Sequence, residues 1–208
     1  IECMKIFDKV IVPYDYLKDI LQTHGVNCEA LNWYTSPLIR ETPKVIEKTM
    51  RPNKRVFLYV GTNDVRKNTI KLASLFEQVL DGTEHTLIMK TNTTNNLPES
   101  KNIKYITKRL SNNEMAGLYN ICDYVVSFSR GEGVGLPMLE AEYFNKPVIT
   151  HTGGVLSTIR NDNWIELPSK EISIDYTNVP KFLQKVFHGT WWEIDEQEAL
   201  RIINNLIQ

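Results

Sequence analysis

The sequence predicts an α/β fold in which helices cover both faces of a parallel β-sheet. Strand-like, β-branched runs alternate with helix-like amphipathic segments from residue 55 to residue 190, as in parallel sheets with helical crossovers. The chain has 208 residues, of which 42% are hydrophobic and 24% charged, and this composition is typical of a globular protein with a sizeable core. Late in the series, a glycine-rich turn separates a strand from a helix, which is where such sheets bind ligands.

The first 33 residues are interpreted as a small α/β unit. A β-branched run predicts a strand at 9–13, and apolar residues at helical spacing predict a helix over 14–24. Gly25 should end this helix, and a second short strand is expected at 28–33. Residues 34–54 carry three prolines and many charges without periodicity, so they are interpreted as an interdomain linker.

Beyond the linker, residues 55–190 are expected to form one domain. Its clearest helix start is at Ser111 and Glu114, which have the spacing of a capping box ahead of an apolar stripe. Strands are expected at 55–61, 85–90, 103–106, 124–128, 146–151 and 164–167. Helices are expected at 67–80, 112–122, 134–144 and 179–187, with a short helix after Gly153-Gly154 and a final helix at 193–207. This last helix defines a C-terminal segment, residues 191–208.

Charge and cysteine content narrow the function classes. The chain has 24 basic and 25 acidic side chains, so no nucleic acid partner is expected. Its three cysteines are too widely spaced for a metal knuckle or a redox motif, and they indicate a reducing, cytoplasmic compartment. Two of them lie beside apolar runs and are interpreted as small buried hydrophobic residues. No apolar run approaches the roughly 18 residues that span a bilayer, so we expect a soluble chain. Peripheral attachment at the inner membrane surface stays open.

The pair Trp191-Trp192 leaves two alternatives open, a membrane-interface anchor or packing of the C-terminal tail on the sheet. Packing is favoured, because the acidic residues that follow, beginning with Glu193, would be repelled by an anionic membrane.

The glycine-rich turn is the first candidate site. Gly133 and Gly135 leave room for a ligand at the entrance of a helix, whose backbone N–H groups and dipole favour an anion. Pro137 suits the first turn of that helix. Glu132 and Glu140 flank the turn and could accept hydrogen bonds from sugar hydroxyls. The alternative is that Glu140 is a helix-surface residue and that Glu132 is a negative charge stabilised by the dipole at the helix N-terminus.

A second candidate site follows the first strand of the domain, where Gly61 and Thr62 lead to the adjacent cations Arg66 and Lys67. Cations at a helix N-terminus oppose the helix dipole, so an anion such as a diphosphate would explain them. Two solvated surface cations are the alternative.

Together these segments resemble the nucleotide-sugar-binding half of the retaining GT-B glycosyltransferases of family 4. The residues that carry the resemblance are Gly61 with Arg66-Lys67-Asn68, Glu132 to Glu140 with Gly133-Val134-Gly135-Leu136-Pro137 between them, Lys146-Pro147-Val148-Ile149, and Gly153-Gly154. The resemblance covers about residues 54–190 and implies a Rossmann-like, C-terminal donor-binding domain. It further implies that residues 1–33 are a remnant of the acceptor-side domain, most of which is missing here, and that the final helix returns toward that domain.

The resemblance also implies the roles of individual residues. Lys67 would hold the donor diphosphate, Glu132 would contact the transferred sugar, and Glu140 would bind the ribose hydroxyls. Many members have an arginine directly after the first glycine, where this chain has Thr62, and Arg66 is expected to compensate. The candidate catalytic residues are therefore Glu132, Lys67 and Arg66. The candidate donor-binding residues are Gly61, Thr62, Lys67, Arg109 and Leu110 (near the base), Gly133, Val134, Gly135, Leu136 and Glu140.

The reaction implied is transfer of a glycosyl group from a UDP-, GDP- or ADP-sugar with retention at the anomeric carbon. Neither a metal nor another cofactor is expected, because Lys67 and the helix ends would stabilise the leaving diphosphate. The acceptor, a glycan or a lipid-linked molecule, cannot be named, and an acceptor domain or partner subunit is required. The alternative function is a non-catalytic nucleotide-sugar-binding module or regulatory subunit. A dinucleotide-dependent oxidoreductase is disfavoured, because Gly61 stands alone after its strand.

His151, at a predicted strand end, is interpreted as a loop histidine rather than a ligand contact.

Overall fold

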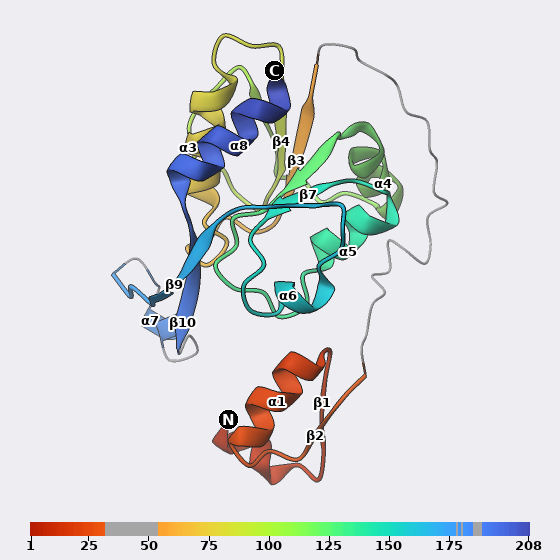
Figure 1. Ribbon diagram of the computed structural model, residues 1–208, viewed down its shortest axis with the longest axis vertical. Helices are drawn as coiled ribbons and strands as arrows, with labels where there is room; N and C mark the ends of the chain where they lie inside the picture. Colours follow the sequence, from red (N-terminus) through yellow and green to blue (C-terminus); the bar gives the residue numbers. More distant parts are fainter. Residues whose placement is uncertain (32–53, 178, 180, 185–188) are drawn as a thin grey trace.

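The computed structural model describes residues 1–31, 54–177, 179, 181–184 and 189–208 (Figure 1). Its centre is a six-stranded sheet in the order β5-β4-β3-β6-β7-β8, in which every neighbouring pair is parallel. The strands are β3 (Val56–Val60), β4 (Thr86–Lys90), β5 (Ile103–Ile106), β6 (Tyr124–Val126), β7 (Val148–Thr150) and β8 (Trp164–Glu166). The predicted parallel α/β fold is therefore confirmed.

The chain order reverses next to β3. From β3 the chain adds β4 and then β5 on one side, and afterwards β6, β7 and β8 on the other. In open parallel sheets, the crevice at such a reversal lies beyond the carboxyl ends of the two central strands. The loops that follow β3 and β6 therefore meet at one place.

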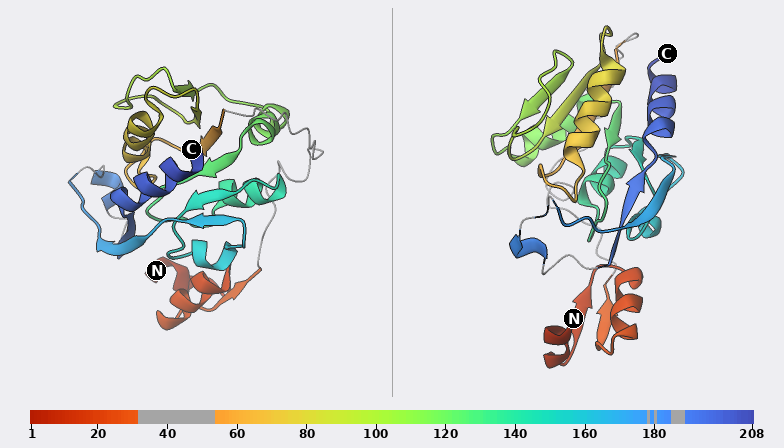
Figure 2. Two further views of the ribbon diagram at one scale, coloured as in Figure 1. Left: turned by 45° about the horizontal axis from the view of Figure 1, so that its top comes forward. Right: turned by 90° about the vertical axis from the view of Figure 1, so that its left-hand side faces the viewer.

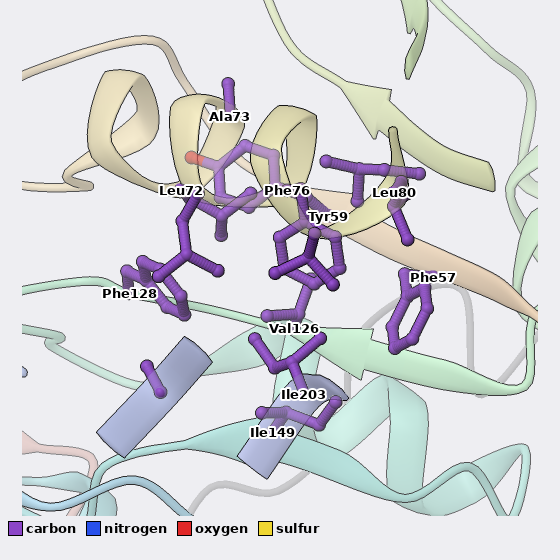
Figure 3. Packing of buried hydrophobic residues seen from close by; sticks show 14 of the residues in the cluster. Phe57, Tyr59, Leu72, Ala73, Phe76, Leu80, Val126, Phe128, Ile149 and Ile203 are labelled. Atoms are coloured by element: carbon purple, nitrogen blue, oxygen red, sulfur yellow. The ribbon is translucent and has the colours of Figure 1, made fainter. Parts of the chain in front are cut away.

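Helices cover both faces of this sheet (Figure 2). On one face, α3 (Thr69–Leu80) and α8 (Glu196–Ile207) pack on Phe57, Tyr59 and their neighbours (Figure 3). On the other face, α4 (Asn112–Ile121), α5 (Leu136–Tyr143) and α6 (Leu156–Ile159) pack on Val56 and Leu58. Alternate residues of β3 thus pack in the hydrophobic cores on opposite faces of the sheet, because successive side chains of a strand point to opposite faces.

The predicted capping box of α4 is present. The Ser111 side chain accepts a hydrogen bond from the Glu114 N–H, and the Glu114 carboxylate accepts one from the Ser111 N–H at 2.8 Å. The backbone hydrogen bond from Ser111, followed by Lys108, lowers the pKa of Glu114 to about 2. The box fixes the start of α4, which brings Tyr119 to the candidate site.

The N-terminal unit contains η1 (Glu2–Ile6), β1 (Val10–Val12), α1 (Asp15–Thr23) and β2 (Cys28–Ala30). β1 and β2 pair in parallel, as the strand–helix–strand interpretation requires, whereas the 3-10 helix η1 was not predicted. The linker prediction for 34–54 falls almost entirely on residues 32–53, which lie outside the described residues.

The prediction for the C-terminal segment was wrong in part. Thr190–Ile194 forms a strand, β10, which pairs antiparallel with the unpredicted strand β9 (Ser169–Ser173). No helix therefore begins at 191 or 193. Instead α8 begins at Glu196, where the Asp195 side chain accepts hydrogen bonds from the N–H groups of Gln197 and Glu198.

The helix predicted at 179–187 corresponds to α7 (Lys181–Gln184), and residues 185–188 lie outside the described residues. Within the described parts of the chain, no helix combines the length and apolar character needed to cross a bilayer.

Candidate functional site

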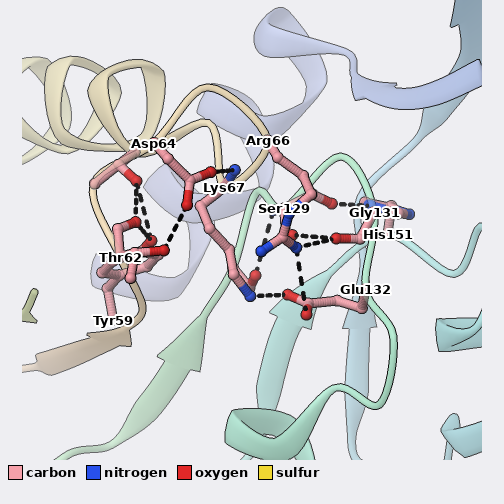
Figure 4. A network of polar contacts seen from close by, with 11 residues as sticks. Tyr59, Thr62, Asp64, Arg66, Lys67, Ser129, Gly131, Glu132 and His151 are labelled. Atoms are coloured by element: carbon pink, nitrogen blue, oxygen red, sulfur yellow. Dashed lines mark hydrogen bonds and ion pairs between the residues drawn. The ribbon is translucent and has the colours of Figure 1, made fainter. Parts of the chain in front are cut away.

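The site is built from the loops that follow β3 and β6. Their backbones are joined where the Arg130 N–H donates a hydrogen bond to the Arg66 carbonyl at 2.7 Å. The first loop carries the predicted cations and the second leads into the glycine-rich turn, so segments that are 65 residues apart in the chain lie side by side (Figure 4). The reversal of strand order beside β3 produces this contact.

The three predicted catalytic residues form one cluster. Lys67 Nζ lies 2.5 Å from Glu132 Oε1, and Arg66 Nη1 lies 3.8 Å from Glu132 Oε2. Arg66 Nη1 also donates a hydrogen bond to the Gly131 carbonyl at 2.5 Å. The side chains of Glu132 and Lys67 are only 7% and 12% exposed, so water screens their interaction weakly. The anion expected beside the two cations is, in this structure, the carboxylate of Glu132.

The loop after β3 holds Lys67 in place. Asp64 accepts hydrogen bonds from the Lys67 N–H at 2.9 Å and from the Thr62 hydroxyl at 2.5 Å. The buried Tyr59 hydroxyl donates to the Thr62 carbonyl at 3.0 Å, and burial raises the pKa of Tyr59 well above its usual value. Because this loop is tied at both ends, the position of the Lys67 ammonium is set by the fold rather than by a flexible segment.

The glycine-rich turn combines one strained position with open space. Gly135 has a φ of +75°, and an added Cβ would lie 2.7 Å from Ile159 Cδ1, so this position requires glycine. An added Cβ at Gly133 would meet nothing within 4 Å. Pro137 lies in the first turn of α5, as predicted.

The backbone N–H groups at the start of α5 are available for an anion. In the described part of the chain, no acceptor is paired with the N–H groups of Val134, Gly135 or Leu136. The start of an α-helix leaves such donors unpaired, and the helix dipole adds positive potential there. The turn therefore carries unpaired backbone donors next to the Lys67–Glu132 pair.

Glu140 is neither a solvated surface residue nor part of the Lys67 cluster. The hydroxyl of the fully buried Tyr119 on α4 donates to Glu140 Oε2 at 2.7 Å. Burial, followed by the charge of Glu140, raises the pKa of Tyr119 well above its usual value, so the tyrosine remains a donor. This contact holds the carboxylate of Glu140 on the inner side of α5.

The two residues predicted to lie near the base are in the loop between β5 and α4. Arg109 is exposed, whereas Leu110 packs with the cluster that contains Tyr119. Across the described residues, no hydrogen bond or ion pair joins either of them to Lys67 or Glu132. Their role at the base stays a prediction.

A cavity of about 600 Å³ adjoins the loop after β3. Asn63, Asp64, Asn68 and Arg130 line it, together with residues of the loop after β4. Among the described residues, Lys67 and Glu132 are not part of its lining, so the cavity and the charged cluster are neighbours rather than one site.

The prediction from sequence missed a support formed by β10. Arg130 Nε donates to Glu193 Oε2 at 2.6 Å and its guanidinium lies 5.3 Å from the centre of the Trp191 ring. Lys71 Nζ is 2.5 Å from Glu193 Oε1. Burial raises the pKa of Glu193, but the hydrogen bonds from Arg130 and Lys71 outweigh it, and the net shift is downward. The network ties β10 to the loop after β6.

His151 belongs to this support and not to a ligand contact. It is fully buried, its Nε2 lies 2.6 Å from the Ser129 carbonyl, and its Nδ1 accepts from the Gly153 N–H at 3.0 Å. These partners assign the proton to Nε2. Its ring stacks on Trp192, with centroids 6.1 Å apart, and burial lowers its pKa. These contacts favour a role for His151 in the packing of the loops over a contact with a ligand.

Trp191 and Trp192 pack on opposite faces of β10. Trp191 is buried with Ile174 and Val179, whereas Trp192 lies against Gly153, where an added Cβ would be 2.0 Å from the indole ring. Packing was the alternative favoured from the sequence, and both tryptophans do pack against neighbouring residues, although they belong to a strand and not to a helical tail.

Among the described residues, no three His, Cys, Asp or Glu side chains are grouped to hold a metal ion, and metal-independence stays a prediction.

Comparison with known families gives a match over residues 42–172 to the model described as glycosyl transferases group 1. The chain belongs to this family. No curated protein sequence matches it significantly.

Solved structures similar to the chain are GT-B glycosyltransferases. The C-terminal domain of a glycosyl transferase group 1 family protein (LpcC) from Francisella tularensis is 20% identical, with a TM-score of 0.50, over 74% of this chain and 75% of that domain. WaaG, a glycosyltransferase involved in lipopolysaccharide biosynthesis, is 14% identical, with a TM-score of 0.67, over 95% of this chain and 53% of its own.

A third similar structure is TarM from S. aureus, in complex with fondaparinux, alpha-GlcNAc-glycerol and UDP. It is 20% identical, with a TM-score of 0.58, over 77% of this chain and 34% of that chain. Identities this low support the fold alone. The chain thus spans about half the length of WaaG and a third of the length of TarM, and it corresponds to the C-terminal, Rossmann-like part of a GT-B fold.

Proposed function

We propose that the chain is the donor-binding part of a retaining glycosyltransferase that transfers a sugar from a nucleoside diphosphate sugar. The observation that carries the proposal is the Lys67–Glu132 pair beside the open N–H groups of the glycine-rich turn. Family membership supports sugar transfer, and the site supplies positive charge and hydroxyl-binding carboxylates where a donor would lie.

Each part of the site has a role in this reaction. Cleavage of the sugar–phosphate bond builds negative charge on the leaving diphosphate, which Lys67 and the α5 N–H groups would stabilise. Glu140, held by Tyr119, would accept hydrogen bonds from the ribose hydroxyls. Arg66 is proposed to compensate for the arginine that is missing at Thr62, because its guanidinium reaches the Gly131 carbonyl beside the turn.

Donor binding requires Glu132 to change partners. Without a ligand, its carboxylate is paired with Lys67, and a diphosphate at Lys67 would replace that pair. The released carboxylate lies beside the turn and could then accept hydrogen bonds from the hydroxyls of the transferred sugar. Retention is proposed to follow from attack on the face that the leaving phosphate occupies, as the family resemblance implies.

The donor base, the sugar and the acceptor belong to the proposal. UDP is the first nucleoside diphosphate to test, because the TarM structure contains it. The acceptor is proposed to be a glycan or a lipid-linked molecule held by an acceptor domain or a partner subunit, with the N-terminal unit as the part of that domain in this chain. A non-catalytic module would bind the same donor and fail to turn it over with any acceptor domain.

The test is calorimetric titration of the chain with UDP, GDP and ADP, and with their sugars. We expect one nucleoside diphosphate to bind, and the matching nucleotide sugar to bind at least as tightly. If none of the six classes of ligand binds, the donor-site proposal is wrong.

A further inference from the structure

The N-terminal unit contacts the glycine-rich turn directly. Tyr14 is only 1% exposed, and its hydroxyl donates a hydrogen bond to the Val134 carbonyl at 2.8 Å, across 120 residues of sequence. Leu17 packs in the same cluster, with Val155 and Leu156. The unit interpreted as part of the acceptor-side domain thus forms one wall of the packing around the turn.

This hydrogen bond fixes the orientation of one peptide group in the turn. The Val134 carbonyl and the Gly135 N–H belong to the same planar peptide, so they point in opposite directions and turn together. Gly135 provides one of the two Cα atoms that this peptide joins, and a glycine restricts rotation there less than another residue would. Without an outside partner for the carbonyl, the peptide could rotate and carry the Gly135 donor away from its present direction.

Two side chains hold backbone carbonyls of the turn from different sides. Arg66 bonds to the Gly131 carbonyl from the loop after β3, and Tyr14 bonds to the Val134 carbonyl from the N-terminal unit. The first contact is internal to the donor site. The second depends on where the N-terminal unit lies.

We propose that Tyr14 is a positioning residue that couples the place of the N-terminal unit to the conformation of the donor-binding turn. The proposal rests on the function proposed above, since it is the donor that would use the Gly135 N–H. When the unit packs on the turn, the Gly135 donor is fixed for an anion, and when the unit moves away the turn relaxes and donor affinity falls. By the reciprocity of coupled equilibria, donor binding would hold the unit in its packed position.

Tyr14→Phe tests this coupling, because it removes the hydroxyl and keeps the ring. Hydrogen–deuterium exchange, read by mass spectrometry on the whole chain without ligand, should show faster exchange of the Met138 and Leu139 amides, which donate to the Gly135 carbonyl, and little change in the central strands. Tyr16→Phe is the matched control, since Tyr16 lies two residues after Tyr14, in the first turn of α1, and is 38% exposed. Leu17→Ala keeps the hydroxyl but weakens the packing of the unit, and it should give a smaller change in the same direction.

Calorimetry supplies the second readout. If the wild-type chain binds UDP, Tyr14→Phe should weaken binding by about fivefold, the effect of one ordinary hydrogen bond. Exchange at Met138 and Leu139 that equals wild type, or that rises equally throughout the chain, would overturn the coupling. If no nucleotide binds to wild type, the proposed function fails, while the exchange experiment still decides whether Tyr14 holds the turn.

Discussion

The Lys67–Glu132 pair should stabilise the free protein and compete with anion binding at the same time. Removing one partner of a buried ion pair typically costs about 3–5 kcal/mol, because the other charge is left without compensation. Here the cost should be lower for Lys67→Met, about 2 kcal/mol, because Arg66 remains 3.8 Å from the carboxylate and is 28% exposed. Glu132→Gln leaves two adjacent cations without a counter-charge, and about 3 kcal/mol is expected.

A double-mutant cycle measures this interaction. Urea unfolding of wild type, both single variants and the double variant gives the coupling free energy, expected at about 1–3 kcal/mol for residues in contact. Arg201→Gln is the control, because its ion pair with Glu198 is exposed on both sides and should contribute below about 1 kcal/mol.

The same Glu132→Gln variant should bind inorganic pyrophosphate more tightly than wild type, since no internal carboxylate competes for Lys67. The competition argument fails if the coupling is below about 0.5 kcal/mol, the usual error of additivity, or if pyrophosphate affinity is unchanged or weaker in the variant.

Three further predictions concern the supports of the site. Tyr119→Phe should reduce the preference for UDP over 2′-deoxy-UDP, measured by calorimetry, because Glu140 loses the donor that orients it. The free energy of unfolding should decrease as the pH is lowered from about 7 to 5, because histidine in the unfolded chain gains a proton near pH 6.5 whereas burial lowers the pKa of His151. The slope due to this histidine is at most about 1.4 kcal/mol per pH unit, and His151→Gln should reduce it. Gly153→Ala should cost about 1–3 kcal/mol in urea unfolding, since its Cβ would overlap the Trp192 ring.

Each of these predictions has a control or an outcome that contradicts it. An equal loss of affinity for UDP and 2′-deoxy-UDP in Tyr119→Phe would indicate general damage, not loss of ribose recognition. A pH slope in His151→Gln that equals the wild-type slope would contradict its assignment to this histidine. Gly117→Ala should be neutral or stabilising, because an added Cβ meets nothing within 4 Å inside α4. A destabilisation equal to that of Gly153→Ala would refute the overlap argument.

Features that depend on local sequence were predictable. The capping box at Ser111, the glycine at the strained position 135 and the proline at the start of α5 each reflect backbone chemistry within a few residues. The meeting of Lys67 with Glu132 was also within reach, since both follow strands whose carboxyl ends lie at one edge of a parallel sheet.

Other contacts between distant segments could not be predicted in the same way. Strands β9 and β10 pair across residues 174–189, and the short run Thr190–Ile194 adjoins a helix-like segment, so its alternation was hidden. The contacts Tyr14–Val134 and Tyr119–Glu140 depend on side-chain rotamers and on packing between elements. Neither the periodicity nor the spacing of residues in the sequence predicts rotamers or packing. For this reason the sequence explained Glu140 equally well as a ligand-binding residue and as a helix-surface residue.

The charge of the site explains how it can be stable both empty and occupied. Arg66, Lys67 and Glu132 together leave one net positive charge, and burying Lys67 without Glu132 would leave a poorly solvated ammonium in the free protein. A diphosphate brings more negative charge than the carboxylate and meets additional N–H donors on α5, so it should displace Glu132 from Lys67. The displaced carboxylate needs a new hydrogen-bonding partner, and a sugar hydroxyl beside the turn provides one. Glu132 would therefore favour a donor that carries a sugar over the bare diphosphate, because only that donor satisfies the carboxylate it displaces.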